Sequence, residues 1–278
     1  AGVGQQVRNL EEYLGRDLFV RAPKGVTPTD DARDIEAELR DGLVALGNVL
    51  EKLRSERSHQ RLKLTVDAPF FEMWLASRLA NFQAENPGVE LLAESDNRMV
   101  DLLAEDFDFA IRYAPEQPDI YHSVTLFSVG LVPICTADFA RRYDLARHPT
   151  TLKGVPLYHI KEATEDPNWV DWQGWCDLHG VQPGDMEKGL RFTKISHGLQ
   201  VAKSGLGPAL GGLLEISAAL QEGSIILPFD PKFGCPSVFK YRLVSVRGRR
   251  QSSAHRQFRD WIQKQAAEFR TETAGLLV

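Results

Sequence analysis

Few residues of this chain have the types and spacing that covalent or metal chemistry needs. Ser196 and His197 are adjacent, but no Gly-x-Ser-x-Gly turn surrounds them, as a nucleophilic serine of that kind requires. The seven histidines lack metal-ligand spacing, and the three cysteines lie too far apart for a paired zinc or redox motif. The sequence therefore predicts no enzyme, no metal and no cofactor. Non-covalent binding is the chemistry left for its polar side chains.

Candidate binding residues follow the predicted strands. In open α/β sheets, ligands gather beyond the carboxyl ends of strands, often at helix N-termini. The residues at such positions are Pro69, Phe70, Phe71, Ser95, Asp96, Arg112, Tyr113, Tyr158, Thr193, Ser196 and His197. Each also has a structural interpretation, as a helix cap, a core residue or part of a solvated loop. We expect these residues to line a ligand site, in which helix starts after Pro69 and at Ser196 could bind an anionic group.

The elements that must position these residues alternate along the chain. Leu62, Leu64 and Val66 alternate as in a strand, and Pro69 suits the first turn of a following helix. Further strands are predicted at 89–93, 107–112, 123–127, 130–135, 155–160, 192–194, 206–210, 225–227 and 241–246, and helices at 98–104, 137–143, 169–179, 196–204 and 252–269. Two successive α/β series indicate two lobes with a cleft between them.

A long helix is predicted at 29–57, before the first strand. Its apolar positions lie three or four residues apart and form one narrow seam: Ile35, Leu39, Leu43, Leu46, Leu50 and Leu53. Thr29 can serve as its N-cap. A narrow seam on a long helix predicts dimerisation. The alternative is an amphipathic helix that packs on its own domain.

Composition limits the function classes further. The 278 residues include 43% hydrophobic residues and carry a net charge of −5. No apolar run reaches the roughly 20 residues of a membrane span. No secretion signal is visible, so we expect a cytoplasmic protein without membrane contact. The net charge argues mildly against nucleic-acid binding, which would then need a local patch.

Residues 1–28 carry a recognisable pattern. A helix ends at Gly15, which suits the left-handed conformation of a helix C-terminus. The pattern consists of Gln6, Val7, Arg8, Leu10, Glu11, Leu14, Gly15, Leu18, Phe19 and Arg21, then Gly25, Val26 and Thr29. It resembles the end of the winged helix-turn-helix of LysR-type transcriptional regulators, with the wing and the entry to the linker helix. The layout is similar to that of the branch of glycine-cleavage and β-lactamase activators. Because members of that family have further helices upstream of this pattern, the resemblance implies that the chain is N-terminally truncated.

The resemblance implies an α/β protein of three parts. These are a partial winged helix-turn-helix at 1–28, a linker and dimerisation helix at 29–58, and an effector-binding domain at 59–278 that resembles periplasmic binding proteins. Lobe I would comprise about 61–132 and 240–278, and lobe II about 133–239. In the complete protein, Gln5, Gln6 and Arg8 would read bases of double-stranded promoter DNA, and Arg21 and Lys24 would contact its backbone. The chain would act as a homodimer or homotetramer that senses a small molecule, with an anionic effector as one possibility.

Two alternatives remain open at this stage. The chain could be an effector-binding fragment that dimerises without reading DNA, which the absent upstream helices favour. It could also be a solute-binding protein, which the absent export signal opposes. Many members of the family have Ser or Thr after the first strand of this domain. Pro69, Phe70 and Phe71 stand there instead, which favours a bulkier or more apolar effector.

Overall fold

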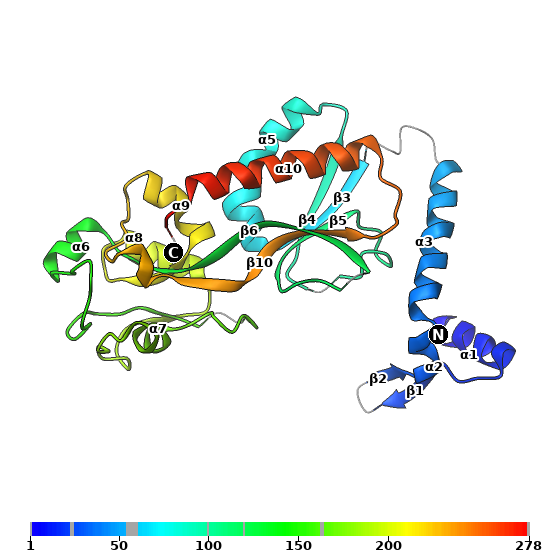
Figure 1. Cartoon of the computed structure of the whole chain (residues 1–278), viewed down its shortest axis with the longest axis horizontal. Helices are drawn as coiled ribbons and strands as arrows, with labels where there is room; N and C mark the ends of the chain where they lie inside the picture. Colours follow the sequence, from blue (N-terminus) through cyan, green and yellow to red (C-terminus); the bar gives the residue numbers. More distant parts are fainter. Residues whose placement is uncertain are drawn as a thin grey trace. The chain divides into compact units, whose positions relative to one another are not determined.

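The computed structural model of the chain describes residues 2–22, 25–53, 61–98, 100–118, 120–161 and 164–276. The chain forms two units, Ala1–Ser58 with Arg247–Arg250, and His59–Val246 with Gln251–Val278. Figure 1 shows the elements of both units, coloured along the sequence. Among the described helices, none combines the length and the apolar character that crossing a membrane requires.

The N-terminal unit begins with a helix and a small hairpin. Helix α1 spans Gly2–Leu14 and ends at Gly15, whose φ of +67° confirms the predicted left-handed helix end. Strands β1 (Phe19–Ala22) and β2 (Gly25–Pro28) pair antiparallel. The Glu11 carboxylate accepts the backbone N–H groups of Leu18 and Phe19 at 2.8 and 3.0 Å, and so ties the helix to the start of the hairpin.

The long helix that follows is divided in two. Helix α2 spans Asp30–Asp34 and helix α3 spans Glu36–Leu53. Thr29 is the N-cap as predicted, because its side chain accepts the N–H of Ala32. The division falls at Ile35, whose N–H donates to the carbonyl of Arg33 instead of continuing the α-helical ladder. The last four residues of the predicted helix, 54–57, lie outside the described residues.

The second unit is built on a six-stranded sheet with the order β4-β3-β5-β10-β6-β9. Its strands are β3 (Arg61–Val66), β4 (Glu90–Ser95), β5 (Phe109–Ala114), β6 (Tyr121–Ile134), β9 (Ala209–Gly212) and β10 (Cys235–Val246). Strand β3 pairs parallel with β4 and β5, while β10 runs antiparallel to β5 and β6. The three parallel strands therefore match the strands of the predicted β-α-β-α-β series, and the last strand pairs with one of them.

Lobe I is the part built on β3, β4, β5 and the helices that cover them. These helices are α4 (Ala68–Phe70), the π-helical turn η2 (Phe71–Leu75), α5 (Ala76–Glu85) and α10 (Ser253–Glu272). Figure 1 shows α10 in red along the sheet. The core of lobe I is aromatic: Phe70, Trp74 and Phe127 pack together, and Phe258 from α10 belongs to the same cluster. Helix α10 therefore packs against the core of lobe I.

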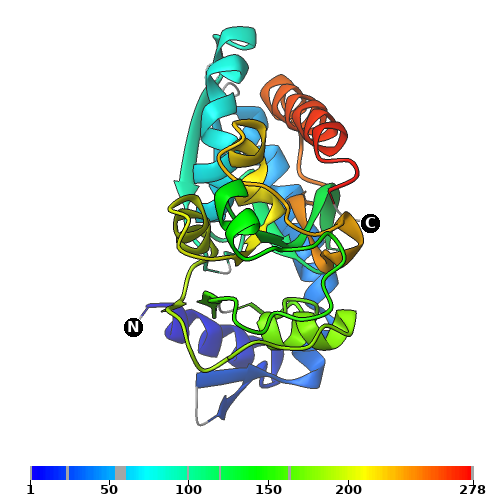
Figure 2. The ribbon, with the colours of Figure 1, turned by 90° about the vertical axis from the view of Figure 1, so that its left-hand side faces the viewer.

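Lobe II is the part built on α6 to α9 and β7 to β9. Its helices are α6 (Ala137–Arg142), α7 (Trp172–His179), α8 (Ile195–Lys203) and α9 (Leu213–Gln221), with short strands β7 (His159–Ile160) and β8 (Arg191–Phe192) and the 3-10 turn η3 (Pro231–Phe233). Trp172 and Trp175 are fully buried in its core. Figure 2 looks at lobe II from its end, with α7 and α10 on opposite sides of the strands between them.

Two long strands, β6 and β10, run through both lobes. The prediction of two separate strands at 123–127 and 130–135 is wrong, because pairing with β10 keeps β6 continuous through Gly130. On β10 the register shifts between Pro236 and Lys240, so residues 237–239 leave the regular ladder. The change of lobe falls at this point, since Val129 belongs to the core of lobe I and Leu131 to that of lobe II.

Other local predictions also need correction. Residues 98–104 do not form the predicted helix in their described part. The Asp101 side chain there accepts the N–H groups of Leu103 and Ala104 and closes a turn. Ser196 is not a helix cap, because α8 already begins at Ile195 with Lys194 as its N-cap. Helix α9 was not predicted at all. The mixed α/β, two-lobed fold class stands.

Candidate functional site

A cleft of about 570 Å³ lies between the two lobes. This volume is in the range of small-molecule sites. Both lobes supply its walls, and β6 and β10 contribute from the strands that connect them. Its lining residues are Asp67, Pro69, Asn97, Arg112, Tyr113, Ala114, Gln117, Val129, Thr164, Glu165, Trp169, Ile195, Gly212, Leu214, Glu215, Phe239 and Tyr241.

On the lobe I side, an aspartate and an arginine lie side by side. Asp67 directly follows β3, and its carboxylate accepts the Tyr113 N–H at 2.8 Å. Its other oxygen lies 3.5 Å from Arg112 Nε. Burial raises the pKa of Asp67, against the opposite effects of the Tyr113 N–H and of Arg112. Arg112 also donates to the Ile111 carbonyl and to Thr65 Oγ1, so its guanidinium is held by the protein itself.

The helix start on this side is already satisfied. Asn97 Oδ1 accepts the Ala68 N–H at 3.0 Å, and Pro69 has no N–H to offer. Asp67 occupies the N-cap position of α4 and places a carboxylate near the positive end of that short helical segment. The N-terminus of this helix therefore already faces hydrogen-bond acceptors that the chain itself supplies.

One wall of the cleft is aromatic and centres on Tyr113. Its ring centroid lies 5.9 Å from that of Trp169, 5.6 Å from Phe239 and 5.5 Å from Tyr241. Trp169 comes from lobe II, Tyr113 from β5, and the other two from β10. The four rings form a continuous apolar surface across the boundary of the lobes.

A buried carboxylate holds this wall together from behind. Asp166 accepts hydrogen bonds from the hydroxyls of Tyr113 and Ser237 and from the Phe239 N–H, the last at 2.9 Å. Burial alone would raise its pKa, but the donors, Ser237 and Tyr113 foremost, lower it. Burial and the hydrogen bond to Asp166 raise the pKa of Tyr113, which keeps its hydroxyl protonated. The cluster connects the loop before α7 in lobe II to β5 and to the irregular part of β10.

On the lobe II side, the cleft meets the starts of α8 and α9. Glu215 lies in the first turn of α9 and is 8% exposed. A Cβ atom added at Gly212 would lie 2.2 Å from Glu215 Oε2 and 2.9 Å from Ile195 Cδ1. Glycine at this position therefore allows the carboxylate to fold back over the start of its own helix.

The structure places three of the predicted ligand residues in the cleft lining, Pro69, Arg112 and Tyr113. Phe70 is fully buried in the core of lobe I, and Phe71 packs half-buried against that core. Ser95 ends β4 outside the lining, and Asp96 pairs with Arg98 at 2.8 Å. In this conformation, Phe70 has no exposed surface to offer a ligand.

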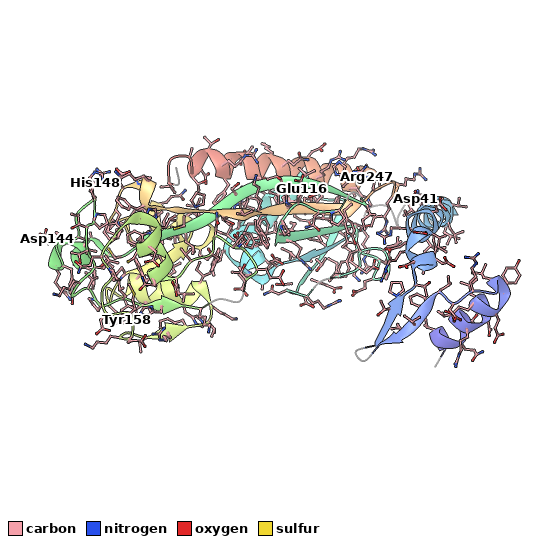
Figure 3. All side chains as sticks on the ribbon, turned by 60° about the horizontal axis from the view of Figure 1, so that its bottom comes forward. Asp41, Glu116, Asp144, His148, Tyr158 and Arg247 are labelled. Atoms are coloured by element: carbon pink, nitrogen blue, oxygen red, sulfur yellow. The ribbon has the colours of Figure 1, made fainter. Side chains whose placement is uncertain are left out.

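The predicted residues of lobe II also lie apart from the cleft lining. Tyr158 borders a separate small cavity, and its carbonyl accepts the Trp172 indole N–H at 3.0 Å; Figure 3 shows it among the elements of lobe II. Thr193 is exposed before α8, Ser196 is half-buried in its first turn, and the exposed His197 lies beside the Phe192 ring. It is Ile195 that lines the cleft.

Several lining residues were missed in the sequence. Trp169, Trp172 and Trp175 are three residues apart and were assigned to one helix face. In the structure Asp171 caps α7, so Trp169 precedes the helix and lines the cleft. Leu214 and Glu215 lie on α9. Most residues of this helix are buried, so its sequence lacks the alternation of apolar and polar faces that identifies a surface helix. The regular spacing of the three tryptophans was the signal available in the sequence. It did not show that Trp169 lies outside the helix, which depends on the N-cap at Asp171.

The predicted DNA-reading residues lie on α1 of the N-terminal unit. Gln5, Gln6 and Arg8 are exposed, and Gln5 Nε2 donates to Asn9 Oδ1 at 2.9 Å. Lys24 and the side chain of Arg21 lie outside the described residues. The described seam side chains, Ile35, Leu39, Leu43, Leu46 and Leu50, are between 40% and 58% exposed. The side chain of Leu53 is not among those described.

Comparison with known proteins gives one consistent result. Residues 55–267 match the model of the LysR substrate binding domain. A curated relative, the HTH-type transcriptional activator AmpR of Rhodobacter capsulatus, is 31% identical over 96% of this chain and 88% of its own length. The glycine cleavage system transcriptional activator of Escherichia coli is 25% identical over 96% of this chain and 85% of its own.

Solved structures agree with this result. The effector domain of AmpR from Pseudomonas aeruginosa has a TM-score of 0.57 and 27% identity, covering 76% of this chain and 98% of that one. The full-length virulence activator AphB of Vibrio cholerae has a TM-score of 0.53, covering 94% of this chain and 88% of that one. At 13% identity, the second likeness concerns the fold alone.

Proposed function

This chain belongs to the LysR family of transcriptional regulators, which are not enzymes, and we propose that it senses a small molecule in the cleft between its lobes and thereby controls transcription. LysR regulators bind DNA and small-molecule effectors and act as oligomers. For this chain, the observation that carries the proposal is the cleft itself, whose walls come from both lobes. Behind the wall, Asp166 joins Tyr113 and Ser237 by hydrogen bonds across the lobe boundary.

The connection between the lobes supports a mechanism. Strands β6 and β10 run through both lobes, and the pairing of β10 is irregular between Pro236 and Lys240. Such a connection can act as a hinge. A ligand that contacts Tyr113 of lobe I and Trp169 of lobe II favours the lobe arrangement that satisfies both contacts. It shifts the equilibrium by its difference in affinity for the two arrangements.

The output side of the proposal lies in the N-terminal unit. We assign residues 1–28 to the end of a winged helix-turn-helix, in which Gln5, Gln6 and Arg8 face DNA. Support comes from their exposure on one helix that is followed by an antiparallel hairpin. The exposed seam of α3 would pair two chains, so the unit would read DNA with two-fold symmetry.

The test is selection of DNA from a random library by the purified chain, followed by affinity measurements at several salt concentrations. We expect enrichment of a two-fold symmetric site, with affinity that falls steeply as salt rises. Replacing Gln5, Gln6 and Arg8 together by Ala should abolish the enrichment. Glu12→Ala, an exposed change on the same helix, serves as the control.

Two results would contradict the proposal. One is the absence of any enriched sequence, and the other is unchanged affinity in the triple variant. Either would favour the alternative, an effector-binding dimer that does not read DNA through these residues.

A further inference from the structure

We infer that the cleft selects an uncharged ligand with a flat, aromatic body, rather than the anionic ligand that the sequence suggested, and that Asp67 sets this selectivity by neutralising Arg112. This inference rests on the proposed function, because it names the ligand class of the same cleft. Three features of the lining carry it: the ion pair of Asp67 and Arg112, the surroundings of the other charged residues, and the aromatic wall.

The positive charge of the cleft is matched within the protein. Among the described residues that line the cleft, Arg112 is the one cation. Its Nε lies 3.5 Å from Asp67 Oδ1, and the two side chains are only 12% and 15% exposed. Its other two nitrogens donate to the Ile111 carbonyl at 2.9 Å and to Thr65 Oγ1 at 2.6 Å. A ligand carboxylate would compete with Asp67 and with these acceptors, so Arg112 provides no free counter-charge for an anion.

Asp67 is fixed beside Arg112 by the backbone of the strand next to it. Its carboxylate accepts the Tyr113 N–H at 2.8 Å, and its own N–H donates to the Ile111 carbonyl at 3.2 Å. Both partners belong to β5, the strand that also carries Arg112. The match of charges is therefore a part of the folded lobe, and not a contact between mobile surface side chains.

The other charged residues of the described lining do not favour a cationic ligand. They are two carboxylates, Glu165 and Glu215. Glu215 is 8% exposed and already takes part in an interaction within the chain. Glu165 is exposed on a loop, where water weakens its attraction for an ion. Moving an ion from water into the cleft without a partner costs free energy, whereas an uncharged ligand avoids that cost.

The aromatic wall provides contact area for the body of the ligand. Four contiguous rings from both lobes line the cleft, those of Tyr113, Trp169, Phe239 and Tyr241. Aromatic side chains pack favourably against another ring at such distances, beyond the gain from burial alone. Asn97 and Thr164 line the same cleft and can form hydrogen bonds with an uncharged polar group. The lining therefore fits an aromatic ring that carries a neutral polar substituent.

The experiment compares three probes that share an aromatic ring and a short chain and differ in charge: phenylacetamide, phenylacetate and phenethylamine. Affinities are measured by isothermal titration at neutral pH and moderate salt. The amide and the carboxylate have nearly the same shape, so their comparison isolates the charge. We expect phenylacetamide to bind at least about fivefold more tightly than either ion, because each ion loses water without gaining a free partner.

A variant of Asp67 should reverse the preference. Asp67→Asn keeps the shape of the side chain and an oxygen for the Tyr113 N–H, but leaves Arg112 without its counter-charge. We expect phenylacetate to gain about tenfold in affinity relative to phenylacetamide, since the arginine then attracts an anion. In Asp67→Asn/Arg112→Gln, which lacks both charges, the preference for the amide should return. Asp177→Asn, an exposed change on α7, is the matched control.

Two further variants complete the set. Trp169→Ala should weaken all three probes, because it removes one ring of the aromatic wall. Asp67→Ser also removes the charge and offers an oxygen at the same position, and it replaces Asp67→Asn if that variant does not fold.

The outcomes separate this inference from the proposed function. If phenylacetate or phenethylamine binds the wild type as tightly as phenylacetamide and loses affinity in Trp169→Ala, the inference is overturned and the cleft remains the effector site. An unchanged order of affinities in the variants of Asp67 overturns the role of that residue. Absence of phenylacetamide binding, or binding that Trp169→Ala does not affect, overturns the inference as well. The proposed function has its own test in DNA selection, which does not depend on these probes.

Discussion

The N-terminal unit and the two-lobed unit treat their apolar residues in opposite ways. On α1 and α3, Leu14, Leu39 and Leu46 are between 46% and 58% exposed. In the two-lobed unit, by contrast, core side chains such as Trp74 and Trp175 are at most 1% exposed. The two-lobed unit closes its cores with its own residues. The N-terminal unit presents apolar surface that another molecule can cover, as a dimerising and DNA-reading part would.

The largest expected effect comes from substitutions in the exposed apolar seam of α3. Replacing Leu39 and Leu46 by Glu puts two charges into the proposed dimer seam, and burying an unpaired charge costs about 3–5 kcal/mol. We expect the chain to sediment as a monomer at micromolar concentration. Ala37→Glu/Ala45→Glu, two exposed positions on α3 outside the seam, should leave the sedimentation unchanged. A Leu39→Glu/Leu46→Glu variant that sediments like the wild type would show that the seam is not an interface.

The next effect concerns the buried side. Phe127 packs in the core of lobe I against Phe70, Trp74 and Phe269, with the last ring centroid at 4.6 Å. Phe127→Ala should lower the free energy of unfolding of the two-lobed unit by about 3–5 kcal/mol in urea titration. The exposed Leu14→Ala should change it by less than about 0.5 kcal/mol. Similar losses in both variants would contradict the contrast between the units.

An effect of intermediate size tests the role of Asp166 at the boundary between the lobes, through the dependence of stability on pH. The Asp166 pKa lies below its ordinary value of 3.8, so its contribution to stability is present above that pH and is lost as the pH falls through the folded-state pKa. Asp166→Asn should cost about 1–3 kcal/mol at neutral pH. It should also flatten the loss of stability below about pH 4. The readout is thermal unfolding across pH, with Asp177→Asn, on α7, as the control. An unchanged acid slope would argue against this role.

The smallest effect lies at the start of α2. Thr29 Oγ1 accepts the Ala32 N–H at 3.2 Å and donates toward the Asp17 carbonyl. Thr29→Ala should destabilise the N-terminal unit by about 1 kcal/mol, measured by amide hydrogen exchange in α2, and Thr29→Ser should restore most of the loss. Equal exchange rates in wild type and Thr29→Ala would show that the cap contributes nothing there.

Much of the fold could be predicted, because its signals are local. The alternation of Leu62, Leu64 and Val66 identified β3, and the helical spacing of Phe258, Trp261 and Ile262 identified α10. The continuity of β6 could not be predicted in the same way. It depends on pairing with β10, which lies more than a hundred residues further along the chain.

The site was harder to predict than the fold. Residues at strand ends, Arg112 and Tyr113, were found because topology alone brings them to the cleft. Phe70 was assigned to the ligand by its position in the sequence, yet the first helical turn directs it into the core. Glu215 lies on a helix without amphipathic pattern, so nothing in the sequence pointed to the charge that it brings into the cleft.

The most direct test of whether the effector binds between the lobes is a substitution that fills the cleft. Ala114 lines it at the end of β5, and Ala114→Trp would occupy part of its volume, whereas Ala76→Trp on the exposed side of α5 is the control. The ligand is the strongest stabiliser from a thermal-shift screen of amines, amino acids and small carboxylates. We predict that isothermal titration shows its binding to the wild type and to Ala76→Trp, with the affinity for Ala114→Trp reduced at least about tenfold. Equal affinity for all three proteins would place the effector outside the cleft and contradict the account.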